Sequence, residues 1–134
     1  MPPRYLLDTN ICIYLQREKT PEIVNRFRGL EQGEAAMSVV THGELRYGVE
    51  RSQFKEKSLA ALEELAELIP VLSLPEGAGA EYGQIRSELE RLGTIIGNND
   101  MWIAAHARAT KLVLVTNNER EFKRIAGLKI ENWV

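Results

Sequence analysis

The chain has 134 residues, of which 44% are hydrophobic and 27% charged, as expected for one folded domain over residues 1–134. Its 17 basic and 19 acidic residues give a net charge of -2, which excludes nucleic-acid binding through bulk positive charge and leaves room only for a smaller basic rim. One cysteine and two histidines exclude an internal disulfide, a zinc site built on cysteine pairs and a histidine-rich metal site. Any bound metal must therefore have oxygen ligands.

Short apolar runs alternate with helical patterns along the chain. In chain order, the sequence predicts a strand at 5–7, helices at 11–15 and 21–30, a strand at 35–40, helices at 41–52 and 57–69, a strand at 71–73, helices at 78–92 and 101–110, a strand at 112–115, a helical stretch at 118–125 and a strand at 128–130. The strands are continuous apolar runs, which favours a parallel sheet covered by helices on both faces. In such α/β sheets, ligands bind at the carboxyl ends of the strands, where the strand order reverses.

The start of the chain does not have the pattern of an export signal. Only three apolar residues follow Arg4 before Asp8 interrupts them, and no run approaches the roughly 18 apolar residues that cross a membrane. Together with the free Cys12, this predicts a protein of the reducing cytoplasm without a membrane association.

Three carboxylates stand where helices are predicted to begin, and each has a structural explanation. Asp8 follows the first strand and suits the N-cap of the next helix. Glu44 comes three residues after Thr41, the spacing of a capping box. Asp100 lies at the start of another helix, where capping would also be sufficient.

The positions of these carboxylates also point to a shared site. Asp8 and Glu44 follow, directly or nearly, two predicted parallel strands, and the helix that begins at Asp100 can return to the same edge of the sheet. A cluster of carboxylates repels itself unless a cation neutralises it. Mg²⁺ prefers a few carboxylates with water and substrate phosphate, and it can activate water and stabilise a phosphoryl transition state.

Four sequence blocks in order resemble the PIN-domain ribonucleases, and in particular the VapC toxins of bacterial toxin–antitoxin pairs. The blocks are LDTN at 7–10, ELRYG at 44–48, NDMWIAAHA at 99–107, and LVTNN at 114–118 followed by REF at 120–122. The resemblance spans nearly the whole chain. It implies a PIN-like three-layer fold with a central parallel sheet of four or five strands, and an endoribonuclease that depends on Mg²⁺ or Mn²⁺. It also implies a VapB-type antitoxin as partner, a homodimer, and structured RNA such as tRNA as substrate.

The resemblance assigns roles to individual residues. Asp8, Glu44 and Asp100 match the acidic positions of the family and are the candidate metal residues. Asp8 and Asp100 would hold the metal directly, and Glu44 would complete the acidic pocket or bond a metal-bound water. The chain departs from the family at Asn118, where many members have aspartate, whereas Glu121 matches a further family acid. Asn118 and Glu121 are therefore the candidates for the fourth site residue.

Two polar residues beside these acids are candidates for orienting them. Asn10 and Thr116 could position the carboxylates or their waters, or could be ordinary cap and turn residues.

The other residues with functional chemistry have mainly structural interpretations. We expect His106 to be structural and Cys12 to be a small buried hydrophobe. Trp102 could stack on RNA or pack in the core, and packing is favoured. A basic RNA-facing rim could include these residues, each of which could equally be a solvated surface charge: Arg46, Arg86, Arg108 and Lys111.

Two functions of other classes are alternatives. One is a different Mg²⁺-dependent phosphotransfer enzyme such as a phosphatase, although two aspartates separated by one residue are missing after the first strand. The other is a non-catalytic protein-binding module in which the acids only cap helices. Metal binding among the three acids separates the second alternative from both enzymes.

Overall fold

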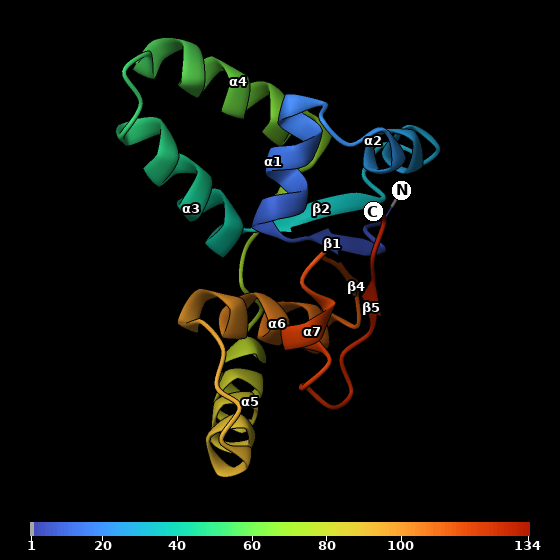
Figure 1. Cartoon of the computed structure of the whole chain (residues 1–134), viewed down its shortest axis with the longest axis vertical. Coiled ribbons are helices and arrows are strands. Elements are labelled where there is room, and N and C mark those ends of the chain that lie inside the picture. Colours follow the sequence, from blue (N-terminus) through green and yellow to red (C-terminus); the bar gives the residue numbers. More distant parts are fainter. Residues whose placement is uncertain (1) are drawn as a thin grey trace.

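The structure is a computed structural model that describes residues 2–134, and its central element is a five-stranded parallel sheet (Figure 1). The strands lie in the order β3-β2-β1-β4-β5. Their bounds are β1 (Tyr5–Leu7), β2 (Ala35–Ser38), β3 (Val71–Leu72), β4 (Val113–Val115) and β5 (Ile130–Glu131). The order runs one way from β1 to β3 and the other way from β4 to β5, so it reverses between β1 and β4.

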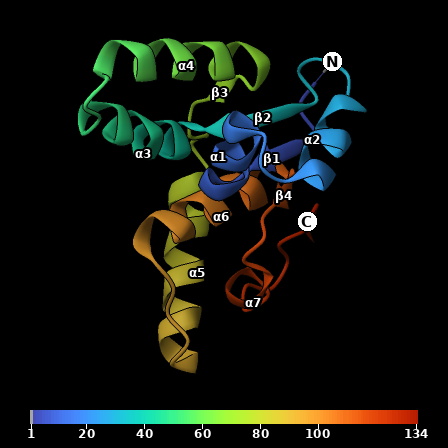
Figure 2. The same ribbon diagram turned by 45° about the horizontal axis from the view of Figure 1, so that its top comes forward.

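Helices cover both faces of the sheet, which confirms the predicted α/β architecture. On one side lie α1 (Thr9–Arg17), α2 (Pro21–Arg28), α3 (Val39–Glu50) and α4 (Lys55–Leu68). On the other side lie α5 (Ala78–Leu92), α6 (Asn98–Thr110) and the single turn α7 (Glu119–Phe122). The pair α3 and α4 extends away from the sheet on one side, and α5 extends away on the other (Figure 2).

The continuous apolar strands supply two separate cores because successive side chains of a strand point to opposite faces. In β1, Tyr5 and Leu7 pack in the core under α1–α4, whereas Leu6 packs in the core under α5–α7. In β4, Val115 belongs to the first core and Leu114 to the second. Burial on both faces explains why these strands lack an apolar/polar alternation.

The second strand is shorter than the sequence predicts, because Ser38 ends it. Ser38 is the N-cap of α3, and its hydroxyl accepts a hydrogen bond from the backbone N–H of Val40 at 3.1 Å. The same hydroxyl lies 2.8 Å from Nδ1 of His106 on α6. The prediction of strand through Val40 and of a helix start at Thr41 was therefore wrong by two to three residues. The last strand also differs, since it lies at Ile130–Glu131 rather than at 128–130.

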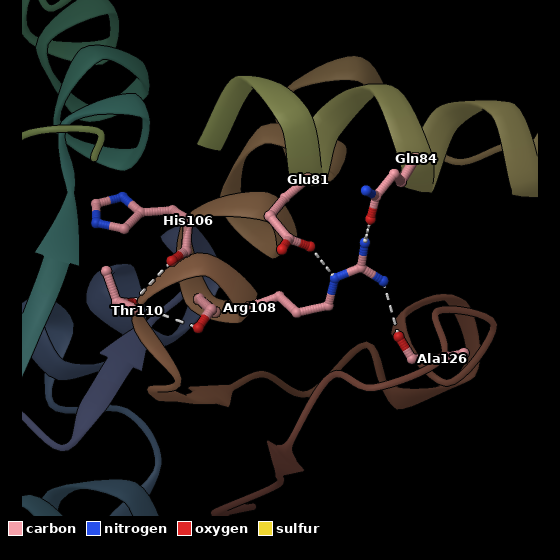
Figure 3. Close-up of polar contacts among 7 residues, drawn as sticks. Glu81, Gln84, His106, Arg108, Thr110 and Ala126 are labelled. Atoms are coloured by element: carbon pink, nitrogen blue, oxygen red, sulfur yellow. Dashed lines mark hydrogen bonds and ion pairs between the residues drawn. The ribbon is translucent and has the colours of Figure 1, made fainter. Parts of the chain in front are cut away.

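Arg108 on α6 joins three parts of the fold rather than forming part of an RNA-facing rim (Figure 3). Its guanidinium donates to the Glu81 carboxylate and to the Gln84 side chain on α5, and to the backbone carbonyl of Ala126 at 2.9 Å. The Arg108 side chain is only 19% exposed. The prediction of a rim or solvated charge at this position was wrong.

Within residues 2–134, no helix combines the length and the apolar character that a membrane span needs.

Candidate active site

Asp8 lies at the switch point of the sheet, directly after β1, and it also caps α1. Its Oδ1 accepts a hydrogen bond from the backbone N–H of Ile11 at 2.9 Å, so the predicted N-cap is confirmed. The residue is only 5% exposed. Burial raises the pKa of Asp8, and the charge of Glu44 raises it further, against hydrogen bonds from the Thr116 side chain and from the backbone of Ile11 and Asn10. The Asp8 carboxylate thus bonds the backbone of α1 and also lies near a second carboxylate, that of Glu44.

Glu44 projects from α3 toward the end of β1, where a hydroxyl holds it. The Thr9 hydroxyl donates to Oε1 of Glu44 at 2.6 Å, and its oxygen lies 3.2 Å from the hydroxyl of Thr41. Thr41 is a buried residue inside α3 and does not cap it, so the capping-box interpretation of Thr41 and Glu44 was wrong. The second carboxylate is oriented by a residue 35 positions earlier.

Asp100 reaches the same edge from the first turn of α6. The N-cap of this helix is Gly97, which provides no side-chain cap, so the capping interpretation of Asp100 was wrong. Burial raises the pKa of Asp100 to about 6, with further contributions from the charges of three other carboxylates, Glu44, Glu121 and Asp8. The fold therefore gathers Asp8, Glu44 and Glu121 around Asp100, and these four acidic side chains are named here the acidic cluster.

Asn118 and Glu121, the two candidates for the fourth site residue, lie in the segment after β4. Nδ2 of Asn118 donates to Oε2 of Glu121 at 2.8 Å, and the backbone N–H of Asn118 donates to the Thr116 hydroxyl at 2.9 Å. Thr116 is fully buried and also bonds Asp8, so it connects β1 to the segment that carries Asn118. The Asn10 side chain is exposed, and only its backbone N–H bonds Asp8.

The donor set of the acidic cluster suits a hard divalent cation. Among the described residues, no three His, Cys, Asp or Glu side chains are grouped tightly enough to surround one ion by themselves. Mg²⁺ does not require such a cage, because it usually keeps several waters and takes one or two carboxylates together with substrate phosphate. The charges of neighbouring acids help to raise the pKa values of Asp8 and Asp100, as expected for carboxylates placed to share a cation.

A hollow of about 570 Å³ opens beside Glu44. Residues of α1, α3 and α6 line it: Thr9, Val40, Gly43, Glu44, Tyr47 and Asn99. It places open volume next to the acidic cluster, where a substrate can approach.

Comparison with known proteins agrees with this geometry. The family model described as PIN domain matches residues 5–128. A protein of Shigella flexneri named tRNA(fMet)-specific endonuclease VapC is 45% identical over 130 residues, which cover 97% of this chain and 98% of the relative. The chain belongs to the PIN-domain family. Within it, a Haemophilus influenzae protein named Ribonuclease VapC2 is 42% identical over 131 residues, covering 98% of each chain.

Solved structures of related proteins share the fold of this PIN domain over its full length. DNA-bound VapBC from Salmonella typhimurium matches with a TM-score of 0.92 and 42% identity, covering 100% of both chains. VapBC2 from Rickettsia felis, bound to a DNA fragment from its promoter, matches with a TM-score of 0.90 and 40% identity, covering 97% of this chain and 98% of that one. The resemblance to VapC ribonucleases and the predicted parallel sheet are thus confirmed.

Two side chains for which the sequence predicted a structural role, His106 and Cys12, are buried in this PIN domain. His106 is buried, and its ring points toward β2 and α3 (Figure 3), with Ser38 as partner. Cys12 is fully buried, and burial raises the pKa of its thiol. Trp102 is partly buried and packs against the Tyr82 ring at a centroid separation of 3.9 Å, which agrees with the favoured packing interpretation.

Thr9 is the residue near the acidic cluster that the sequence interpretation missed. It lies between Asp8 and Asn10 in the LDTN block, but its partners Thr41 and Glu44 belong to α3. The available signal was a hydroxyl next to a candidate metal ligand at the end of a strand. That signal is weak because hydroxyl residues are common at helix starts.

Proposed function

We propose that this PIN domain is a divalent-metal-dependent endoribonuclease that acts as the toxin of a VapBC-type pair. Mg²⁺ is the proposed metal, and Mn²⁺ can replace it. The observation that carries the proposal is the environment of Asp100, whose pKa is raised to about 6 by burial and by the charges of Glu44, Glu121 and Asp8. A fold that only needed helix caps would not gather four carboxylates at the switch point, because their repulsion costs stability.

Each acid has a distinct role in this proposal. Asp8 and Asp100 hold the cation, and Glu44 completes the acidic pocket. Glu121 is the fourth acid, and Asn118 supports it through the hydrogen bond of 2.8 Å between their side chains. The bound cation supplies positive charge for the phosphoryl transition state and lowers the pKa of the attacking water.

The surrounding residues set the orientation of these acids. Thr116 bonds Asp8 from the end of β4, and Thr9 holds Glu44 with a hydrogen bond of 2.6 Å. Asn10 contributes its backbone N–H to Asp8. The burial of Cys12 and the raised pKa of its thiol argue against a covalent thiolate mechanism, so water is the proposed nucleophile.

The names of the relatives support a substrate and a partner. Proteins of Shigella flexneri and Salmonella typhimurium, 45% and 43% identical, are named tRNA(fMet)-specific endonucleases. We propose tRNA as the substrate, cut in an unpaired loop in the cytoplasm, since proteins read RNA sequence mainly in unpaired segments. The solved VapBC relatives support a VapB-type antitoxin as partner. We also propose that the toxin is a homodimer. An arginine-bearing tail of the antitoxin would pair with the acidic cluster.

Cleavage of purified tRNA tests the proposal. We expect cleavage in millimolar Mg²⁺ or Mn²⁺, none in EDTA, and none by Asp8→Asn. In a bacterial host, expression of the chain alone should arrest growth, and Asp8→Ala should relieve the arrest. Cleavage that persists in EDTA, or full toxicity of a folded Asp8→Ala protein, would exclude a metal-dependent nuclease.

The antitoxin is tested separately. A small co-expressed neighbour should copurify with the chain and suppress tRNA cleavage. A monomer that ignores this neighbour at micromolar concentration contradicts the proposed pairing.

A further inference from the structure

An exposed aromatic ring stands beside the acidic cluster without a role in metal binding. Tyr47 on α3 is 61% exposed and lines the hollow of about 570 Å³ together with Glu44. Residues three apart on a helix lie on the same face, so the Tyr47 ring and the Glu44 carboxylate emerge side by side. The ring therefore borders the path by which a phosphodiester reaches the acids.

The Tyr47 ring is held in place at this position. Nη1 of Arg51, one turn further along α3, donates to the Tyr47 hydroxyl at 2.9 Å. The Arg51 guanidinium also lies 5.8 Å from the ring centroid, a cation–π arrangement. A held aromatic face pays less conformational entropy on binding than a freely rotating one.

Gly43 forms part of the wall of the hollow next to Tyr47. Gly43 lies inside α3, and a Cβ added there would meet nothing within 4 Å. The hollow is therefore open at this position. Asn99 lines the same hollow with an amide that can donate and accept hydrogen bonds.

We propose that this hollow receives an unpaired nucleobase adjacent to the cleaved phosphate, stacked on Tyr47. The proposal rests on the proposed nuclease function and names the part of the substrate that is held beside the metal site. Single-stranded nucleic acid binds through base stacking on aromatic side chains, and RNA bases can also be read through hydrogen bonds to their edges. With a net charge of -2, the chain has little bulk attraction for RNA, so stacking must supply part of the affinity.

Variants of Tyr47 test this inference with a short single-stranded RNA of mixed sequence. We expect Tyr47→Ala to weaken binding in Ca²⁺ and to raise KM in Mg²⁺ about tenfold, within the range of stacking losses, while Tyr47→Phe stays near wild type. The control is Leu92→Ala, which removes an apolar side chain that is 51% exposed at the C-terminal end of α5 and lines no hollow beside Glu44. It should leave both values unchanged.

The stacked base itself can be removed from the RNA. An abasic nucleotide at one position should weaken binding to wild type about as much as Tyr47→Ala does, and the two changes together should cost no more than either alone. Gly43→Leu should also weaken binding by filling the hollow, without lowering the melting temperature. Losses that add at every abasic position would contradict stacking on Tyr47.

Two results overturn the inference independently of the nuclease function. Equal affinity of wild type and Tyr47→Ala for RNA in Ca²⁺ removes Tyr47 from substrate binding, whether or not wild type cleaves RNA. A switch from dimer to monomer in Tyr47→Ala, seen by sedimentation, assigns the ring to contact between two copies instead. If Tyr47→Ala binds RNA tenfold more weakly but wild type cleaves nothing in Mg²⁺, only the nuclease function fails.

Discussion

The neighbourhoods of Asp8 and Asp100 hold the same side chain at the same edge of the sheet but support it differently. Asp8 is tied to the backbone of α1 through Ile11, and Thr116 bonds it from β4. Asp100 lies in the first turn of α6, where the helix is capped by Gly97 and the carboxylate is not the cap. Burial raises the pKa of both carboxyls, but three acidic neighbours act on Asp100.

Asp8 and Asp100 therefore have different roles in the protein, which the sequence alone does not distinguish. Asp8 contributes to the stability of the fold as well as to the acidic cluster, since a capping side chain contributes about 1 kcal/mol. Asp100 contributes charge, and in the metal-free protein that charge is unfavourable. Stability measurements can therefore tell the two carboxylates apart where activity measurements would not.

The largest expected effect is the loss of activity at Asp8. Asp8→Asn should lower RNA cleavage by about 10³-fold or more, because the proposed cation contributes several kcal/mol to transition-state stabilisation. Asparagine still caps a helix, so Asp8→Ala should be less stable than Asp8→Asn by about 1 kcal/mol. Cleavage assays and urea unfolding of both variants measure the two effects. Equal stability of the two variants would mean that the Ile11 hydrogen bond contributes nothing.

The next largest effect is expected on Mg²⁺ affinity, from loss of the Thr9 hydroxyl that holds Glu44. Thr9→Val removes the hydroxyl that donates to Oε1 of Glu44 at 2.6 Å while keeping the shape of the side chain. Groups that orient metal ligands typically change metal affinity about 10- to 100-fold, and we expect a loss near tenfold for Mg²⁺. Thr9→Ser, which keeps the hydroxyl, is the control. Calorimetric titration with Mg²⁺ measures the affinity, and an unchanged value in Thr9→Val would assign the hydrogen bond to the fold alone.

The same contrast explains how far the sequence could predict the site. Asp8 follows a strand whose apolar run ends at Leu7, so its place and its capping role were both readable from local signals. The start of α3 was not readable, because Ser38 and Thr41 are both good N-caps and Val39 and Val40 suit a strand. Tertiary structure favours Ser38 over Thr41 as the N-cap, because Ser38 also contacts His106 on α6.

Contacts between residues far apart in the sequence set a second limit on what could be predicted. The five strands and their parallel arrangement followed from continuous apolar runs separated by helical patterns, and the sheet agrees with them apart from the bounds of β2 and β5. The contact between Thr9 and Glu44 spans 35 positions and has no periodic signal in either segment. Family resemblance located the acids, but only the structure shows which hydroxyls hold them.

The pH dependence of stability provides a smaller and more specific test of Asp100. The pKa of Asp100 is about 6 in the folded protein, above the ordinary 3.8, so the folded state binds more protons than the unfolded state. The contribution of this carboxyl to the stability of the protein therefore falls as pH rises from about 4 through 6. Asp100→Asn removes the charge, and we expect it to stabilise the metal-free protein by about 1 kcal/mol at pH 7.5, since solvent screens part of the repulsion. The gain should shrink as pH falls toward 4.5.

Thermal unfolding of wild type and Asp100→Asn in EDTA, at several pH values, measures this gain. In millimolar Mg²⁺, wild type should gain melting temperature and the variant much less, because a bound ligand stabilises the native state by mass action. A pH-independent difference, together with equal responses to Mg²⁺, would remove Asp100 from the acidic cluster.

The smallest expected effect comes from adding a charge at Asn118. Asn118→Asp replaces the amide that donates to Glu121 with a carboxylate that repels it, so the metal-free protein should lose stability by less than about 1 kcal/mol. The added charge should increase the rise in melting temperature on Mg²⁺ addition. Asn117→Asp is the matched control, because it adds the same charge one residue earlier, at an exposed side chain that bonds Tyr14 rather than Glu121. If both variants respond alike to Mg²⁺, net charge rather than position 118 governs the response, and Asn118 lies outside the metal site.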